Sequence, residues 1–262
     1  MKTIKCNQVD IAYNMDGEGA ITLLFVHGAF IDGSYWSTQA EYFKDHYRVI
    51  TIDLPGHGQS GKARDQWNIE GLGADLSVFI RALNLKNVVL IGHSAGGDII
   101  LETAIQCPDA VIGFIGVDNF KNAGAAMPEK IQSMFSQIKM LLKLNFSFAA
   151  ETFASKALLS EATEPSIANR VISDYKHMDK KIGFELICSS FDYYNREREL
   201  MNRLKLKMFL INVDNIPTNE DLLKTHAASG YEILPIKGTC HFPMLEHPDV
   251  FNSLILSILQ KL

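Results

Sequence analysis

The sequence has few cysteines, no long apolar run and no excess of positive charge. Its four cysteines, Cys6, Cys107, Cys188 and Cys240, are widely scattered among 262 residues and form no Cys-x-x-Cys pair. This spacing argues against a zinc site and against a small disulfide-stabilised fold, and it favours reduced thiols. With 25 basic and 30 acidic residues the net charge is −5. Because no basic stripe is present either, nucleic acid is not an expected partner.

The chain also lacks the signals of a membrane or secreted protein. No apolar run approaches the roughly 20 residues that a membrane-spanning helix needs. The first residues, Met1–Cys6, lead directly into strand-like sequence without the apolar core of a signal peptide. We therefore expect a cytoplasmic protein without a membrane span, either a monomer or a homodimer.

Short apolar runs alternate with helical segments along most of the chain. Strands are expected at residues 7–14, 21–26, 47–52, 88–91, 111–117, 207–213 and 231–235. Helices are expected between and after them, at residues 34–46, 69–83, 98–104, 219–228 and 248–262. This alternation predicts an α/β fold with a mostly parallel sheet.

The alternation stops between residues 121 and 204, where no convincing strand is found. Helices are expected from Pro128 onward, at 165–178 and at 183–203, in a block rich in Met and Phe. The plain interpretation is a helical subdomain that buries its own apolar face. The functional interpretation is a cap whose apolar underside lines a substrate pocket. We therefore predict a core of residues 1–120 and 205–262 and a helical cap of residues 121–204.

The most informative stretch is Gly92–Gly97, with the sequence GHSAGG, between an apolar run and a helical segment. A Gly-x-Ser-x-Gly pattern in a strand–turn–helix context is typical of a nucleophile at the apex of a sharp turn. Glycines on both sides allow the strand and the helix to approach closely, with strained backbone geometry at the serine. Ser94 is therefore predicted to be a nucleophile.

A serine hydroxyl needs a base, and the preferred candidate among eight histidines is His241. It follows the last expected strand, so a parallel sheet would bring it to the same edge as Ser94. His27, His57 and His93 are interpreted as structural. The remaining histidines, on helices or at their ends, are interpreted as solvated: His46, His177, His226 and His247.

The base in turn needs a carboxylate, and two aspartates each follow an expected strand. Asp214 is separated from His241 by one helix and one strand, whereas Asp118 follows the strand nearer to Ser94 in chain order. Asp214 is preferred on this geometry, with Asp118 as the alternative acid. Two backbone N–H groups are the expected donors to an oxyanion. One belongs to Ala95, the residue after Ser94, and the other to Ala29 in the loop His27–Phe30.

The chain resembles the small, capped, esterase-like branch of the α/β-hydrolase fold superfamily. Four motifs carry the resemblance: His27-Gly28, Asp53–Ser60 (DLPGHGQS), Gly92–Gly97, and Gly238–Pro248 (GTCHFPMLEHP). The resemblance implies an eight-stranded, mostly parallel sheet with helices on both faces and a lid inserted after the sixth strand. It also implies a structural role for Asp53.

One departure from the family pattern concerns the acid. The family commonly has Gly-x-x-Asp followed by Pro after the seventh strand, whereas this chain has Asn212–Pro217, with its aspartate one place early. Some relatives carry the acid after strand six instead, which keeps Asp118 open. A further unusual acid, Asp98, is interpreted only as a favourable charge near a helix N-terminus.

These residues predict a serine hydrolase that cleaves a small or medium apolar carboxylic ester through an acyl-enzyme. A small-molecule substrate is the expected partner, and neither a metal nor an organic cofactor is required. The serine nucleophile argues against dehalogenase and epoxide-hydrolase chemistry, which use a carboxylate. The same triad also serves C–C bond hydrolases, lactonases, amidases and cofactor-free perhydrolases, so these remain alternatives. A non-catalytic ligand receptor is less favoured because no triad member is missing.

Overall fold

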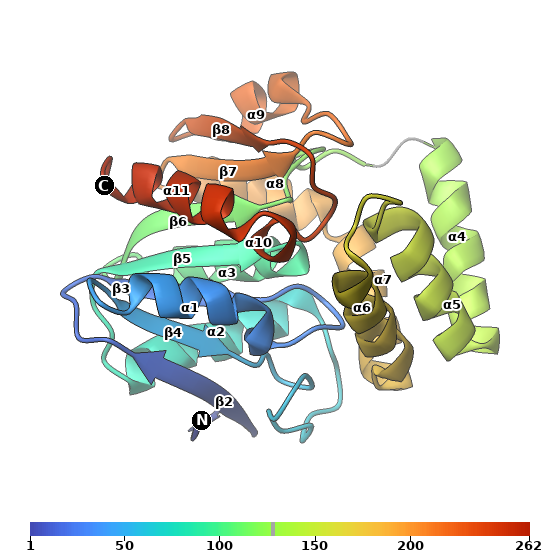
Figure 1. Ribbon diagram of the computed structural model, residues 1–262, viewed down its shortest axis with the longest axis horizontal. Helices are drawn as coiled ribbons and strands as arrows, with labels where there is room; N and C mark the ends of the chain where they lie inside the picture. The colour runs from blue at the N-terminus through green and yellow to red at the C-terminus, as the bar shows by residue number, and fades with distance from the viewer. Residues whose placement is uncertain (127–128) are drawn as a thin grey trace.

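A single eight-stranded sheet runs through the computed structural model, which describes residues 1–126 and 129–262 (Figure 1). The strand order is β1-β2-β4-β3-β5-β6-β7-β8. The first two strands are antiparallel to their neighbours, and all the others pair in parallel. The strands are β1 (Lys2–Cys6), β2 (Val9–Asp16), β3 (Thr22–Val26), β4 (Arg48–Ile52), β5 (Val88–His93), β6 (Val111–Val117), β7 (Met208–Val213) and β8 (Tyr231–Ile236). The prediction of an eight-stranded, mostly parallel sheet is confirmed.

The N-terminal hairpin differs from the single strand expected at residues 7–14. The structure has two strands, β1 and β2, joined by a turn at Asn7 and Gln8, with Asn7 at a φ of 55°. Strand β1 lies at the edge of the sheet, and its Lys2, Thr3 and Lys5 side chains are exposed. An edge strand with few buried residues carries a weak apolar pattern, which explains why it was not predicted.

Helices cover both faces of the sheet. In the view of Figure 1, α1 and α11 lie in front of the strands, and α2 and α3 lie behind them. The helices of the core are η1 (Gly33–Trp36), α1 (Ser37–Phe43), α2 (Ile69–Ala82), α3 (Ala95–Gln106), α9 (Glu220–His226), α10 (Pro243–Glu246) and α11 (Pro248–Leu259). Apart from the short α10, which was not expected, these positions agree with the helices expected from the sequence to within a few residues.

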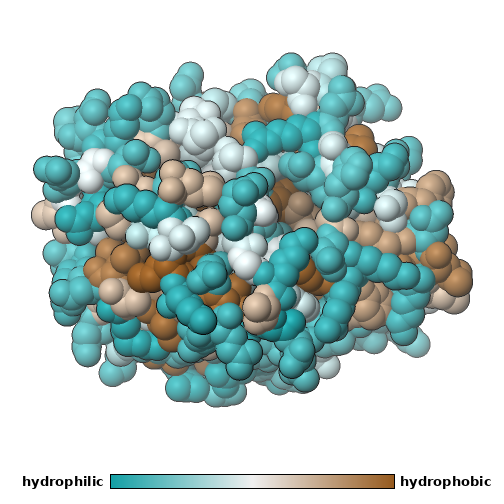
Figure 2. All heavy atoms as spheres, turned by 90° about the horizontal axis from the view of Figure 1, so that it is seen from below, coloured by the Kyte–Doolittle hydropathy of each residue, from teal (hydrophilic) through white to brown (hydrophobic). Residues whose placement is uncertain are grey.

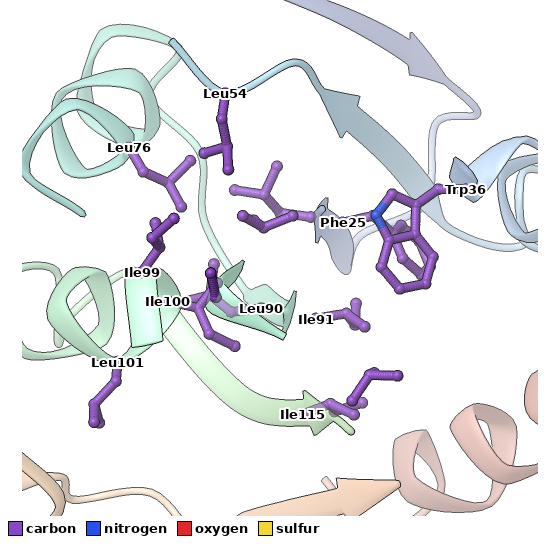
Figure 3. Packing of buried hydrophobic residues seen from close by; sticks show 14 of the residues in the cluster. Phe25, Trp36, Leu54, Leu76, Leu90, Ile91, Ile99, Ile100, Leu101 and Ile115 are labelled. Atoms are coloured by element: carbon purple, nitrogen blue, oxygen red, sulfur yellow. The ribbon is translucent and has the colours of Figure 1, made fainter. Parts of the chain in front are cut away.

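The central strand β5 is buried along its whole length. Figure 3 shows Leu90 on the side of the strand where Leu76 of α2 and Ile99 of α3 lie, and Ile91 on the opposite side, toward Trp36. Successive side chains of a strand face opposite ways, so a strand covered on both faces must be apolar throughout. The residues that follow β5 are therefore held by a strand that is packed on both faces.

Between β6 and β7 the described residues form helices and no strand. We call residues 129–203 the helical insertion. It contains α4 (Glu129–Leu144), α5 (Phe146–Phe153), η2 (Ala154–Leu158), α6 (Pro165–His177), α7 (Lys180–Asp192) and α8 (Tyr194–Arg203). The single helix expected at 183–203 is two helices, α7 and α8, which meet at the buried Tyr193. Pro128, where the first helix was expected to begin, lies outside the described residues.

The two ends of the helical insertion contact different surroundings. Helix α8 packs against α3 of the core: the Arg196 guanidinium forms an ion pair with the buried Glu102, and the Tyr193 hydroxyl donates to the same carboxylate. Helices α4 and α5 lie at the far right of Figure 1, and Figure 2 shows brown, apolar atoms at that end of the surface. Leu144 and Phe148 are 75% and 59% exposed there. Across the two described ranges, no helix is both long and apolar enough to span a bilayer.

Candidate active site

Ser94 lies at the sharp turn between β5 and α3, as predicted. Its backbone has φ 53° and ψ −128°, a conformation that a non-glycine residue adopts only under strain. A Cβ on Gly92 would lie 2.4 Å from the Gly96 carbonyl oxygen, and a Cβ on Gly96 would lie 2.6 Å from the His27 oxygen. Because real Cβ atoms do not approach backbone so closely, only glycine allows this turn. Strained geometry of this kind is stored at functional sites.

The structure pairs His241 with Asp118 and not with Asp214. His241 Nδ1 lies 2.6 Å from Asp118 Oδ2, and both side chains are largely buried. Asp214 is exposed in the turn after β7 and makes no hydrogen bond with His241. The preference for Asp214 as the partner of the histidine is therefore wrong, and the alternative, Asp118, occupies that position. Asp118 is the better placed of the two because β6 lies directly beside β5 in the sheet.

The carboxylate of Asp118 is held by several donors. Its Oδ1 accepts from the Lys121 ammonium at 2.7 Å and from the Val213 N–H at 3.3 Å, while Oδ2 accepts from His241. Burial raises the pKa of the Asp118 carboxyl, but the hydrogen bond and charge of His241, with Lys121, outweigh burial and hold the pKa below its ordinary value. Asp118 is therefore ionised and fixed.

His93 connects the turn at Ser94 to the loop that carries His241. Burial and the nearby His241 lower the pKa of His93 to about 3, so its ring is neutral. His93 Nε2 lies 2.7 Å from the His241 carbonyl oxygen, which requires that this nitrogen carries the proton and donates. The two rings lie 4.6 Å apart between centroids. The structural role expected for His93 thus includes holding the backbone of His241.

Within the described part of the chain, the Ser94 hydroxyl makes no hydrogen bond, either to His241 Nε2 or to another group. The remaining ring nitrogen of His241 is not hydrogen-bonded within that part either. Catalytic hydrogen bonds are often long or poorly aligned without substrate and tighten in the complex. The structure thus brings an oriented imidazole and a strained serine to one edge of the sheet without closing the bond between them.

The loop His27–Phe30 approaches the serine directly. A Cβ on Gly28 would lie 3.0 Å from the Cβ of Ser94, so Ala29 follows a residue in contact with the serine. Ala29 and Ala95 are both more than 90% buried, and neither N–H donates to another element of the described chain. Two free N–H groups beside a serine are the arrangement that holds an oxyanion.

Two neutral histidines fix this loop. His27 Nε2 accepts from the Leu54 N–H at 2.9 Å, and its Nδ1 therefore donates to the Gly28 carbonyl oxygen. His57 Nε2 accepts from the Phe30 N–H at 3.3 Å. Burial lowers the pKa of His27 to about 4 and that of His57 to about 3. Asp53 accepts from the N–H groups of Gly33 and Gln59, so the structural role implied for it is confirmed.

Sequence reasoning missed Asn119, the residue directly after Asp118. Its side-chain amide donates to the Ser94 carbonyl oxygen at 2.7 Å and to Asp98 Oδ1 at 3.3 Å. Its Oδ1 accepts from the Phe120 N–H at 2.7 Å. The only signal in the sequence is its place at the end of a strand that neighbours β5.

From the sequence, Asp98 was interpreted only as a favourable charge near a helix N-terminus. The structure shows a further feature of this residue. It is buried against Glu197 of α8, and the two carboxyl groups share a hydrogen bond. Burial raises the pKa of Glu197 from 4.5 to about 7, and burial beside Glu197 raises the pKa of Asp98 well above its ordinary value. Two buried carboxyl groups in contact cannot both ionise without a large penalty. At neutral pH this pair therefore holds at least one proton.

This pair predicts a pH-dependent stability. Between pH 4.5 and about 7 the unfolded Glu197 has lost its proton and the folded one has not, so the free energy of unfolding falls as pH rises. Glu197→Gln should leave the melting temperature near pH 5 almost unchanged and raise it by a few degrees at pH 8, at about 2–4 °C per kcal/mol. Thermal unfolding of both proteins from pH 5 to 8 measures this difference. Parallel curves for the two proteins would contradict it; Glu199→Gln, an exposed change on the same helix, is the control.

Two cavities lie near these residues. One of about 210 Å³ is lined by residues that include Asp118, Lys121, Asp98, Glu197 and Tyr193. Another of about 220 Å³ lies between the core and the helical insertion and is lined by residues that include Phe30, His57, Asp174 and Met178. Across residues 1–126 and 129–262, no group of three or more His, Cys, Asp or Glu side chains is arranged to hold a metal ion. All four cysteines are free thiols.

Comparison with known proteins places this geometry in a family. A model of the α/β hydrolase fold matches residues 21–199. A putative esterase/lipase of Haemophilus influenzae is 38% identical over 96 residues, 37% of this chain and 33% of that protein. An (E)-2-((N-methylformamido)methylene)succinate hydrolase of Acinetobacter baylyi is 37% identical over 99 residues, 38% of this chain and 37% of that protein. Each of these two matches thus spans less than half of the relative's length.

Solved structures resemble the chain over its whole length. An esterase of Thermogutta terrifontis has a TM-score of 0.83 at 20% identity and covers 100% of this chain and 99% of its own. The enol-lactonase of Burkholderia xenovorans has a TM-score of 0.83 at 18% identity and covers 99% of this chain and 100% of its own. At these identities the similarity shows the fold. Together with the family model, which matches more than half of the sequence, it shows that the chain belongs to the α/β hydrolase fold family.

Proposed function

We propose that the protein is a serine hydrolase that cleaves a small or medium apolar carboxylic ester. Ser94 attacks the carbonyl carbon, and His241 accepts the hydroxyl proton and then delivers it to the leaving alcohol. Asp118 orients the ring of His241 and stabilises its charged form. The N–H groups of Ala29 and Ala95 hold the oxyanion, and water then releases the acid from Ser94.

The observation that carries this proposal is the 2.6 Å contact between His241 Nδ1 and Asp118 Oδ2. An ionised carboxylate on Nδ1 requires that this nitrogen carries the proton, which leaves Nε2 free to accept one. A neutral imidazole in this tautomer is the form that a serine nucleophile needs as its base.

The helical insertion is proposed to act as a cap over the active site. The proposed cap, residues 121–204, contains the insertion and is separate from the core. It contacts the two loops that supply the chemistry. Phe30 stacks against Tyr175 and Phe146 of the insertion, with centroids 4.8 Å and 5.9 Å apart. On the other loop, the His241 N–H donates to the Leu158 carbonyl oxygen at 3.2 Å. The aromatic side chains beside Phe30 favour an apolar acyl group.

A covalent probe tests the proposal directly. A fluorophosphonate should add one phosphonyl group to the Ser94 hydroxyl, lose fluoride, and abolish hydrolysis of short-chain chromogenic esters in proportion to the labelled fraction. Mass spectrometry of the proteolysed protein locates the label, and a colorimetric assay measures the rate. Ester hydrolysis that continues when Ser94 is fully labelled would overturn the proposal.

A panel of other substrates separates the alternative reactions. The same serine chemistry would cleave lactones, amides and C–C bonds flanked by carbonyl groups. The kcat/KM values for these substrates are compared with those for esters. We expect the apolar esters to give the highest values. Labelling of Ser94 without turnover of any panel member would instead favour a ligand receptor.

A further inference from the structure

Lys121 is a charged residue that the proposed reaction does not use, yet it reaches the carboxylate that holds His241. Its ammonium lies 2.7 Å from Asp118 Oδ1, while His241 Nδ1 lies 2.6 Å from Oδ2 of the same side chain. The side chains of Lys121, Asp118 and His241 are only 14%, 6% and 13% exposed. The Lys121 ammonium and the His241 imidazole therefore share one buried carboxylate, each on its own oxygen.

The position of Lys121 is fixed by further contacts. Its ammonium also donates to Asn215 Oδ1 at 3.1 Å, and its carbonyl oxygen accepts from the Asn219 N–H at 2.8 Å. Asn215 in turn donates to the Cys240 sulfur at 3.5 Å, next to His241 in the chain. Lys121 is thereby connected to the segment after β7, directly, and to the loop of His241, through Asn215.

We infer that Lys121 is a positioning residue for the His241–Asp118 pair. It holds Oδ1 of Asp118, orients Oδ2 toward the imidazole, and partly neutralises the negative charge that stabilises the protonated form of His241. This inference rests on the proposed function for its kinetic meaning. Its structural content, an effect of Lys121 on the protonation of His241, does not depend on turnover.

The sign of the effect follows from electrostatics. A positive charge close to an imidazole disfavours the imidazolium ion, and in a partly buried site of effective dielectric near 20 such a charge is worth on the order of one pH unit or more. Removing the ammonium should therefore let His241 keep its proton to higher pH. Since the base must be neutral to act, activity at acidic pH would fall.

The other groups around the pair do not ionise in a way that cancels this effect. His93, at the end of β5, is neutral, with a pKa lowered to about 3 by burial. Burial raises the pKa of the Cys240 thiol, so it is neutral as well. Glu246 of α10, five residues after His241, accepts from the Thr163 hydroxyl and from the Cys240 N–H.

The cavity beside Asp118 also contains carboxyl groups from α3 and α8. Asp98 and Glu197 share protons there, since burial raises both pKa values, that of Glu197 to about 7. Tyr193, from the junction of α7 and α8, keeps its proton because burial raises its pKa. Below pH 7 the Asp98–Glu197 pair therefore holds at least one proton.

Lys121→Met removes the charge and keeps most of the apolar stem. We expect the midpoint of the acidic limb of kcat/KM to move up by about one pH unit, which lowers the rate by about ten-fold at pH values well below both midpoints. The plateau rate at alkaline pH should stay within about five-fold of the starting protein. Lys121→Arg, which keeps the charge, should restore the original midpoint. Lys207→Met, an exposed lysine paired with Glu232, is the matched control and should leave the profile unchanged.

A second readout needs no activity. The ring carbon–proton signals of ¹³C-labelled histidines are followed by NMR from pH 4 to 9, and the signal missing in His241→Gln identifies His241. Its titration midpoint should rise by about one unit in Lys121→Met. An unchanged midpoint, or a Lys121→Arg protein that titrates like Lys121→Met, would overturn the inference. If no ester is hydrolysed but the midpoint moves, the proposed function fails while the inference stands.

Discussion

Ser94→Ala should lower kcat for a short-chain chromogenic ester by about 10⁵–10⁶-fold, since removal of the nucleophile of a triad costs about this much. The loss is expected without a change in fold, because alanine keeps the Cβ and the backbone of the turn, and the serine hydroxyl has no hydrogen bond to lose within the described residues. Stopped and steady-state assays of hydrolysis, together with the melting temperature, measure both quantities.

Ser253→Ala provides the matched control. Ser253 lies exposed on α11, where its hydroxyl donates to the Asp249 carbonyl oxygen. This variant should hydrolyse the ester at the original rate. Turnover that survives Ser94→Ala unchanged would reject the acyl-enzyme mechanism, and it would leave only the family fold established.

Asp118→Asn should lower kcat by about 10⁴-fold, the size of effect that follows when the orienting carboxylate of a triad becomes an amide. An amide can donate to His241 Nδ1, which would place the ring proton on Nε2 and leave no acceptor for the Ser94 hydroxyl. The lost charge would also replace the ion pair between Asp118 and Lys121 with a weaker hydrogen bond from the ammonium to the amide oxygen. A melting curve is therefore needed beside the kinetic assay to separate lost activity from lost stability.

Asp214→Asn is the paired comparison, because Asp214 ends the neighbouring strand but is exposed. We expect kcat within about two-fold of the starting protein, as for an ordinary surface substitution. If Asp214→Asn abolishes turnover and Asp118→Asn does not, the assignment of the acid from the structure is wrong.

The local signals in the sequence were enough for the nucleophile turn and for the histidine loop. Ser94 and its glycines are contiguous, and their geometry follows from steric limits that act over five residues. His241 follows a strand whose parallel pairing could be predicted, so its edge of the sheet was known. Both residues lie where the sequence placed them.

The choice between Asp118 and Asp214 could not be made in the same way. Each follows a strand, and β6 and β7 are neighbours, so the strand pattern treats them alike. The difference arises from the turns: Asp118 has a φ of 47° and accepts from the Val213 N–H, whereas the chain after β7 turns outward at Asp214. Such a difference depends on long-range contacts that no local pattern contains.

The Asp98–Glu197 pair was missed for a related reason. The two residues are 99 positions apart and meet only because α8 of the insertion packs on α3. An acid near a helix N-terminus is ordinary in sequence, and only the packing shows that it is buried. The edge strand β1 was not predicted for a different reason. Most of its side chains are exposed, so its sequence has only a weak apolar pattern.

The hydrogen bond from the His241 N–H to the Leu158 carbonyl oxygen joins the helical insertion to the loop that carries the proposed base. Leu158 ends η2 of the insertion, so an outward movement of that turn must either break this bond or pull on the backbone of the histidine. A bulky ester that can enter only by such a movement would arrive beside a displaced base. Selection by size would then be expressed in kcat rather than in KM, with oversized esters admitted but turned over slowly.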